Sequence, residues 1–565
     1  MMRSAWQRID RKWWQLIWVS SLTGMVGLIY WTLIYRNAPI GIDDANIYFV
    51  YIRNLAEGHG MVYNIGGERV EGFTSSVWVW MAALLYMGTG MVALPLALLN
   101  WVVISLALWK AVQFLGKLNG ETHIFPASGL ALLGLLYVTP GYLEWTLLTL
   151  METGLWSALL LLTTLSLVKY HFHEDHKKTS KALSIWLPLL VITRPESLLW
   201  GLVYLTVWGW TLWGSEKFSL ALKRIILPML TFGGTVAALT GWRLFYFASL
   251  FPNTYYAKVS SDKISNAWVG VEYIVTFFYE IAPVAIVPVT IAILLLLSNL
   301  NKYFLTNKYK GWRRFYYWFN RKHKDWYRSQ LTLSMLLVVG LLIPCYTGGD
   351  HFALGRFYQP LLPIWFMLML NHPFWQNLTF ASGWKEKLTT TRISPFIWLS
   401  MGLLLVSVLP RPNIYLLMLR HAESPLMAEF DIAEDGREFG EVANELFSTV
   451  TPKPSLGVVA AGGVAYTYSG EIVDLLGLNN VAMARADKIK RGKKSHASFN
   501  KSVFFQQKPE LMGRYFGGQV IHDVTSFQLH ENLPSFDQSS YENRLLKGIF
   551  RDPPFIESYQ PVLIS

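Results

Sequence analysis

Charged residues and cysteine are both scarce in this chain. Only 15% of its 565 residues are Asp, Glu, Lys or Arg, whereas 53% are hydrophobic. A soluble protein of this length normally has more charge and fewer apolar residues, so the composition predicts an integral membrane protein. The single cysteine, Cys345, excludes an internal disulfide framework. Any exported part must therefore fold by packing alone.

Several common signatures are also missing. The chain has no internal repeat, Walker loop, HExxH motif or Cys/His cluster with metal-ligand spacing. The apolar run 13–35 is long enough to span a membrane, and it lacks the small-residue cleavage site of a secretory signal. The formal net charge of +12 does not indicate nucleic-acid binding, because the Lys and Arg residues fall largely between apolar runs. Headgroup phosphates are possible partners for some of them.

The apolar runs predict eleven membrane spans. A basic cluster before residue 13 places the N-terminus in the cytoplasm by the positive-inside rule, and the basic loop 302–328 is the clearest further cytoplasmic marker. The short apolar run 74–88 is interpreted as an interfacial or re-entrant helix, because a span needs about 20 residues. The predicted spans are 13–35, 92–116, 123–140, 153–170, two within 182–214, 225–250, 282–300, 331–345, 360–372 and 395–409.

An odd number of spans places the C-terminal part on the outer side. The predicted domains are a transmembrane domain over 1–409, with a first external loop over 36–91, and an exported α/β domain over 410–565. In the second domain, 456–461 and 471–478 resemble buried strands and Gly462-Gly463 a turn or helix entry. The basic run 485–494 is interpreted as a solvated loop, with phospholipid or substrate contact as the alternative.

Two adjacent carboxylates, Asp43 and Asp44, follow the first span directly. Carboxylates so close together beside hydrocarbon repel each other and resist desolvation, so at least one is expected to have a raised pKa, unless a cation lies between them. Such a pair can supply a general base or a metal ligand. The alternative is a solvated loop in which Asp44 caps a helix.

Further polar residues are predicted to lie on the same outer face. The Thr193-Arg194-Pro195-Glu196 segment interrupts an apolar run, and breaks of this kind tend to line cavities. Carboxylates and cations together beside the membrane suit a lipid phosphate that carries a polar group, because Arg and Lys hold phosphate and a carboxylate can accept a proton. The outer set comprises Asp43, Asp44, His59, Glu71, Glu144, Glu152, Arg194, Glu196, Asn253, Lys258, Asp350, His351, Arg356 and Gln359.

The first loop carries a pattern that resembles a known family. Asp43-Asp44-Ala45 is followed by Arg53-Asn54-Leu55, Gly58-His59-Gly60 and Glu71-Gly72-Phe73-Thr74. This pattern is similar to that of bacterial glycosyltransferases of the GT-C superfold that use polyprenyl-phosphate sugars, and most similar to the terminal arabinofuranosyltransferase group. The resemblance extends to Met151-Glu152-Thr153, Thr193-Arg194-Pro195-Glu196, Pro252 to Lys258, Gly348-Gly349-Asp350, Arg356-Phe357 and Asp474-Leu475-Leu476-Gly477-Leu478.

The resemblance implies an inverting sugar transfer at the outer face of a bacterial cytoplasmic membrane, to a glycan, glycolipid or protein of the cell envelope. Asp43 or Asp44 would be the general base. Arg194, Lys258 and Arg356 would bind the donor phosphate. No obligatory metal is expected, although the two aspartates could hold one divalent cation. The residues expected to bind sugar or acceptor are His59, Glu71, Glu152, Glu196, Asn253, Asp350, His351 and Gln359.

Two other classes of protein fit part of the pattern. A lipid or sugar transporter would also place broken helices and ionisable residues in the membrane, but the chain shows no paired halves, and transport gives no reason for a large exported domain. A noncatalytic GT-C-like scaffold for cell-surface assembly would keep the same fold. Turnover separates an enzyme from both, because neither alternative cleaves a sugar–phosphate bond.

Overall fold

The computed structural model describes most of the chain. The described residues are 2–32, 39–281 apart from 122, 174 and 216, 325–371, 424–513 apart from 494, and 540–559. The predicted spans 282–300 and 395–409, most of the basic loop 302–328 and the predicted domain boundary at 409 lie outside these residues.

The N-terminal two thirds of the described chain are helical, as the long apolar runs predict. Apolar helices form readily here because a helix satisfies its own backbone hydrogen bonds without water. The helices are α1 (Met2–Tyr30), α2 (Asp43–Ala56), α3 (Ser76–Thr89), α4 (Ala93–Leu118), α5 (Ala127–Val138), η2 (Glu144–Leu148), α6 (Thr153–His173), α7 (His176–Thr193), α8 (Ser197–Ser215), α9 (Phe218–Phe247), α10 (Asn253–Lys258), α11 (Lys263–Ile281), α14 (Asp325–Thr347), η3 (Gln359–Leu361) and α15 (Leu362–Leu370).

Four of the described helices are long and apolar enough to cross a membrane: Ala93–Leu118, Thr153–Phe172, Ser219–Phe247 and Arg328–Thr347. They coincide with four of the predicted spans, and the helical membrane character of the chain is thus supported. The predicted span 123–140 contains a helix of only 12 residues, α5. The short run 74–88 forms a 14-residue helix, α3, whose N-terminus is capped by the Ser75 hydroxyl.

The C-terminal part is a small α/β unit packed on the first loop. Strands β1 (Leu456–Val458), β2 (Ile472–Asp474) and β3 (Leu511–Met512) form a parallel sheet in the order β2-β1-β3. Leu456 pairs with both Ile472 and Leu511. The two predicted strands are therefore confirmed, in shorter form. The helices of this part are α19 (Met427–Leu446), α20 (Gly463–Thr467), α21 (Val481–Ala486), α22 (Lys501–Gln507), α23 (Tyr541–Leu545), η4 (Ile549–Arg551) and α24 (Pro553–Ser558).

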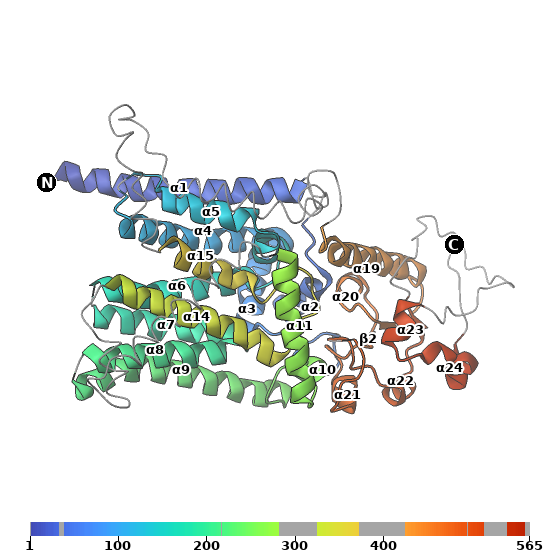
Figure 1. The fold of residues 1–565 in the computed structure, drawn as a ribbon. Coiled ribbons are helices and arrows are strands. Elements are labelled where there is room, and N and C mark those ends of the chain that lie inside the picture. Colours follow the sequence, from blue (N-terminus) through green and yellow to red (C-terminus); the bar gives the residue numbers. More distant parts are fainter. Residues whose placement is uncertain are drawn as a thin grey trace.

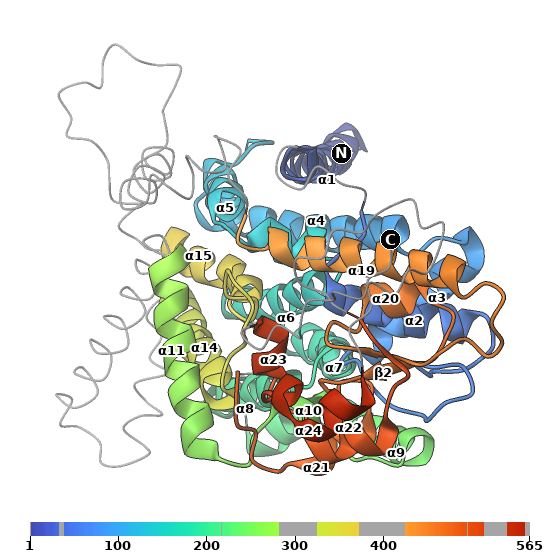
Figure 2. The same cartoon turned by 90° about the vertical axis from the view of Figure 1, so that its right-hand side faces the viewer.

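The long helices run in broadly the same direction, and the C-terminal elements lie at one end of this bundle (Figure 1). Helix α2 lies at the junction between the two. Helix α11 crosses the direction of the bundle in both views and lies at its edge beside α14 (Figures 1 and 2).

Side chains of the first loop attach the C-terminal unit to the bundle. Asn64 exchanges two hydrogen bonds with the backbone of Ile472, at 2.9 and 3.0 Å, as a neighbouring strand would. Tyr51 donates a hydrogen bond to the side chain of Asn479 at 3.0 Å, and Tyr63 donates one to the carbonyl of Ala461. These contacts join residues about 400 positions apart, so they hold the C-terminal unit against α2 and the loop that follows it.

Candidate functional site

Asp44 lies in the first turn of α2 and faces two cations. One of its carboxylate oxygens is 3.6 Å from the Lys258 ammonium and 3.6 Å from the Arg356 guanidinium. The Asp44 side chain is 21% exposed, and that of Lys258 is 23% exposed, so both remain within reach of a ligand. Lys258 ends helix α10 and Arg356 belongs to the turn before η3. Three distant segments thus meet at Asp44.

The turn between α14 and η3 adds a buried carboxylate and a histidine. Asp350 forms an ion pair with Arg356 at 2.5 Å and contacts the His351 Nδ1 at 3.2 Å. Arg356 is buried against the rings of Phe352 and Phe357. Its Nε atom has no hydrogen-bond acceptor among the described residues. The guanidinium is therefore held firmly, with its Nε atom enclosed by the protein.

Asp43, in contrast, is bound to the C-terminal unit. Its carboxylate accepts three hydrogen bonds, two from the Gly462 N–H at 3.0 and 3.1 Å and one from the Gly463 N–H at 2.8 Å. A side chain at position 462 would collide with Asp43, because a Cβ there would lie 1.9 Å from the Asp43 carbonyl oxygen. Glycine at 462 therefore permits this close approach, and both oxygens of Asp43 are occupied.

A second ion cluster forms at the break between α7 and α8. Arg194 donates to Glu152 at 2.7 Å, and its Nε and second terminal nitrogen donate to Glu196 at 3.2 and 3.3 Å. Arg194 and Arg356 lie on the same ring, Phe357, with their guanidinium carbons 5.0 and 5.3 Å from its centroid. The two clusters are therefore neighbours. The second oxygen of Glu152 is buried and has no donor among the described residues.

Four other predicted site residues have different surroundings. Glu71 forms a bidentate pair with Arg243 of α9, with contacts of 2.8 to 3.1 Å. Asn253 donates to the carbonyls of Gly477 and Leu478 at 2.9 and 3.0 Å. The remaining two are Gln359, which is buried and donates to the carbonyls of Pro140 and Leu354, and His59, which is exposed in the first loop. The contacts of Glu71, Asn253 and Gln359 hold backbone and helices in place, and the structure does not bring His59 to Asp44.

Sequence reasoning missed Glu429 and Arg243. Glu429 lies in the first turn of α19, where Asp44, Asp43 and Asp350 all act on its charge. No motif marks it, because it comes from the C-terminal part and meets the site only through folding. Arg243 is an arginine near the end of an apolar helix, and such a position by itself signals a buried partner.

Neighbouring charges and burial shift the pKa values of the site's carboxyl groups in different directions. Burial would raise the pKa of Asp44, but Lys258 and Arg356 outweigh it and hold that pKa below its usual value. Burial raises the pKa of Asp43 to about 7, against the effect of the two glycine N–H groups. Burial and the neighbouring aspartates also raise the pKa of Glu429 to about 7. At neutral pH, Asp44 is therefore the more fully ionised carboxylate of the pair.

The carboxylates of Asp43 and Asp44 face different partners. Asp43 directs its oxygens at N–H groups and Asp44 faces two cations, so the pair does not converge on one cation position. Within the described ranges, no group of three or more His, Cys, Asp and Glu side chains has an arrangement suited to a metal. Lys258 and the Arg356 guanidinium, both beside Asp44, are cations of the kind that bind phosphate groups in proteins.

Comparisons with models of known protein families and with curated proteins found no match for this chain. Its function is therefore inferred from side chains and geometry.

Proposed function

We propose that this protein is a membrane-embedded inverting glycosyltransferase of GT-C type, which moves a sugar from a polyprenyl-phosphate donor to an acceptor of the cell envelope. The observation that carries this proposal is the position of Asp44. It is an ionised and partly exposed carboxylate beside two cations, Lys258 and Arg356, at the end of the bundle where the C-terminal unit lies. A base next to a phosphate site is the arrangement that sugar transfer from a phosphate requires.

Asp44 is assigned as the general base. Its carboxylate would take the proton of the acceptor hydroxyl while that oxygen attacks the anomeric carbon of the sugar. The bond between the anomeric carbon and the phosphate oxygen would break, and the electron pair would leave with the polyprenyl phosphate. This leaving group is already a stable anion, which reduces the need for a metal ion. Asp43 would hold the C-terminal unit instead of taking part in the proton transfer.

Lys258 and Arg356 are assigned to the donor phosphate. Both are now shared with Asp44, and a bound phosphate would compete for their charge. Asp44 would then lose part of the stabilisation of its ionised form and become a stronger base, so that proton transfer is favoured when the donor is present. Arg194 already has two carboxylate partners, and we assign it to positioning Glu152 and Glu196 beside the sugar.

The proposed orientation follows from the sequence. The basic N-terminal segment would lie in the cytoplasm, and the site and the C-terminal unit would lie outside. Eleven spans, an exported domain over 410–565 and a location in a bacterial cytoplasmic membrane belong to this proposal. The donor would then be presented in the outer leaflet, with its phosphate at the level of Lys258 and Arg356.

The test is sugar transfer by the purified full chain in nanodiscs, supplied with a panel of polyprenyl-phosphate sugars and extracted envelope acceptors. We expect the wild type to transfer sugar from at least one donor. Lys258→Met and Arg356→Met should lower the rate mainly by weakening the apparent affinity for that donor. The matched control is Lys508→Met, which removes an exposed cation of the C-terminal unit. A folded protein that transports the donor without breaking its sugar–phosphate bond would replace the proposal with the transporter. Absence of any turnover across a broad panel would favour the scaffold.

A further inference from the structure

Helix α11 has an apolar stripe that the other residues described by the structure leave exposed. Ile264, Trp268, Val271 and Val275 recur at the spacing of one helix face, and all four are exposed. Trp268 is 72% exposed and Ile264 is 75% exposed. The opposite face of α11 is packed, since Tyr273 and Phe277 are buried. The helix is thus attached to the bundle on one side and offers an apolar surface on the other.

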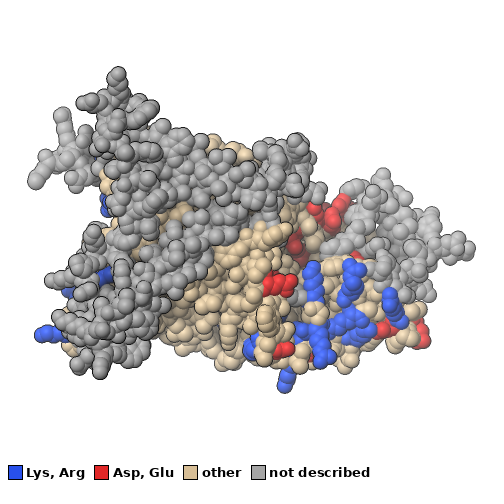
Figure 3. All heavy atoms as spheres, in the orientation of Figure 1, with Lys and Arg blue, Asp and Glu red and all other residues tan. Residues whose placement is uncertain are grey.

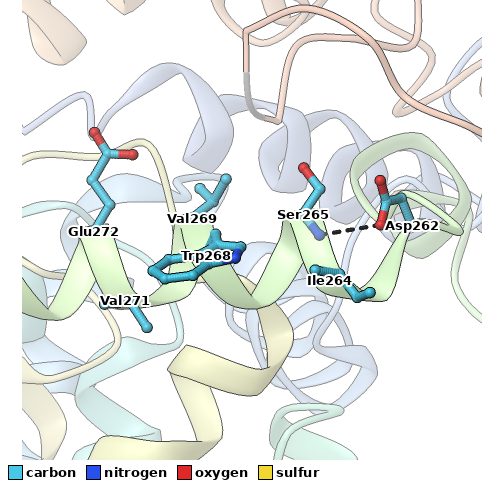
Figure 4. Close-up of a pocket in the computed structure, with 7 residues that line it drawn as sticks. All are labelled: Asp262, Ile264, Ser265, Trp268, Val269, Val271 and Glu272. Carbon is cyan, nitrogen blue, oxygen red and sulfur yellow. Dashed lines mark hydrogen bonds between the residues drawn. The ribbon is translucent and has the colours of Figure 1, made fainter.

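A shallow hollow of about 620 Å³ lies along the first half of this helix. The described residues that line it belong to α11 and the residue before it, and Figure 4 shows Ile264 and Val271 projecting from the side of the helix opposite to Glu272. Asp262 is engaged at the start of the helix, where it accepts a hydrogen bond from the Ser265 N–H at 3.1 Å. The hollow is therefore an open, largely apolar surface with acidic groups only at its edge.

Cations gather at the N-terminal end of the stripe. Lys263, Lys488 and Arg491 are exposed, and no carboxylate of the described residues lies within ion-pair distance of them. Figure 3 shows Lys and Arg side chains collected on this side of the C-terminal unit. Lys263 occupies the first turn of α11, where the helix dipole disfavours a cation, so it does not serve to stabilise the helix.

The loop that carries Lys488 and Arg491 is attached at the end of a membrane-spanning helix. The Ser261 N–H donates to the Lys488 carbonyl at 3.0 Å, and the Lys490 N–H donates to the Ser260 hydroxyl at 3.2 Å. Arg485 donates to the hydroxyl of Ser249, two residues after α9 ends. Because α9 is long and apolar enough to cross a membrane, these contacts hold the loop at the depth where the span leaves the hydrocarbon.

We propose that α11 and this loop form a membrane-surface site for anionic phospholipid. The site comprises the stripe Ile264, Trp268, Val271 and Val275 together with Lys263, Lys488, Ile489 and Arg491. Helix α11 crosses the direction of the bundle, so its long axis lies along the membrane surface (Figures 1 and 2). Its stripe enters the boundary between headgroups and acyl chains, and the three cations bind the headgroup phosphates.

The proposed site lies apart from Asp44 and needs the bundle to span a membrane, but it does not need sugar transfer. Its occupant is a phospholipid of the bilayer and not the polyprenyl donor, because none of these three cations belongs to the cluster around Arg356. Its effect is to hold the C-terminal unit against the membrane, with the loop 485–493 as the contact.

The experiment uses an environment-sensitive fluorophore on the full chain. Cys345 is the only cysteine, so a Cys345→Ser background with Ile489→Cys places one label in the basic loop. The protein is reconstituted in nanodiscs of phosphatidylcholine alone or with increasing phosphatidylglycerol. Emission should shift to the blue as the anionic lipid is added, because the loop then leaves water. Hydrogen exchange of residues 485–493 in the unlabelled wild type should slow in parallel, which guards against an effect of the substitutions.

A double variant with reversed charges distinguishes lipid binding at this site from an effect of the protein's net charge. Lys488→Glu with Arg491→Glu should abolish the response to phosphatidylglycerol, because two surface cations at about 1 kcal/mol each correspond to about thirtyfold in affinity. The matched control is Lys508→Glu with Arg551→Glu, which changes the net charge equally at two exposed positions outside the site. Adding polyprenyl phosphate to phosphatidylcholine discs tests the other lipid anion. The proposal is overturned if the label and the exchange rates respond equally in both kinds of disc, if the control pair loses the response too, or if polyprenyl phosphate alone produces it.

Discussion

The two adjacent aspartates should respond in opposite ways to the same small substitution. Asp44→Asn replaces the ionised carboxylate that faces Lys258 and Arg356, and the amide cannot accept a proton from an acceptor hydroxyl. Loss of a general base lowers turnover by about 10² to 10⁴-fold. The effect on folding should be smaller, because Arg356 keeps its ion pair with Asp350 and Lys258 is partly solvated.

Asp43→Asn should instead act on stability. The carboxylate accepts hydrogen bonds through both oxygens, whereas an amide has one oxygen and would place its own N–H groups opposite the Gly462 N–H, now 3.0 Å from the second oxygen. A buried donor left without an acceptor costs about 1–3 kcal/mol. Turnover per folded molecule should change little, since this carboxylate does not face the cations.

The assay measures both quantities on the same preparations. Sugar transfer in nanodiscs gives the rate, and thermal unfolding followed by loss of the monodisperse chromatography peak gives stability. Ala substitution of the exposed Lys508 serves as a neutral control. The reasoning is refuted if Asp43→Asn stops transfer with unchanged stability while Asp44→Asn works at the wild-type rate.

Three further predictions follow from other parts of the structure. Arg243→Met should destabilise the protein by about 3–5 kcal/mol, since Glu71 would stay buried without a partner, and adding Glu71→Gln should recover most of the loss in a denaturant titration. Gly462→Ala should loosen the C-terminal unit, because the new Cβ collides with Asp43. Limited proteolysis should then cut after residue 424 more rapidly than in the control Gly88→Ala, where a Cβ on helix α3 meets no other atom within 4 Å. The pKa of Glu429 is raised to about 7 in the folded protein. Its contribution to folding stability is therefore fully present below about pH 4, near the pKa of an unfolded glutamate, and is lost as the pH rises through 7. Between about pH 4 and pH 7, the unfolding temperature of Glu429→Gln should therefore fall less than that of the wild type. If the two proteins show the same dependence of unfolding temperature on pH, the acidic neighbours do not raise the pKa of this carboxyl.

The sequence by itself determined the helical membrane character of the protein and the location of four long apolar helices. Long apolar runs leave the backbone only one way to satisfy its hydrogen bonds, which is why 92–116, 153–170, 225–250 and 331–345 could be identified as helices. The break at Pro195 and the two strands after residue 455 could also be predicted, because a proline and a short apolar strand determine the backbone of the residues next to them. Helix α11 was not expected, because its apolar stripe alternates with polar residues and falls below the threshold of a span.

Only the tertiary structure decided which polar residues act together. Asp43 and Asp44 are equivalent in the sequence, yet successive residues of a helix point about 100° apart, so one faces Gly462 and the other faces Lys258 and Arg356. Likewise, Glu71 found its partner in Arg243, 172 positions away. Local pattern fixes an element because hydrogen bonds and burial act over neighbouring residues. The partner of a buried charge depends on how distant elements pack, and that is decided by the whole chain.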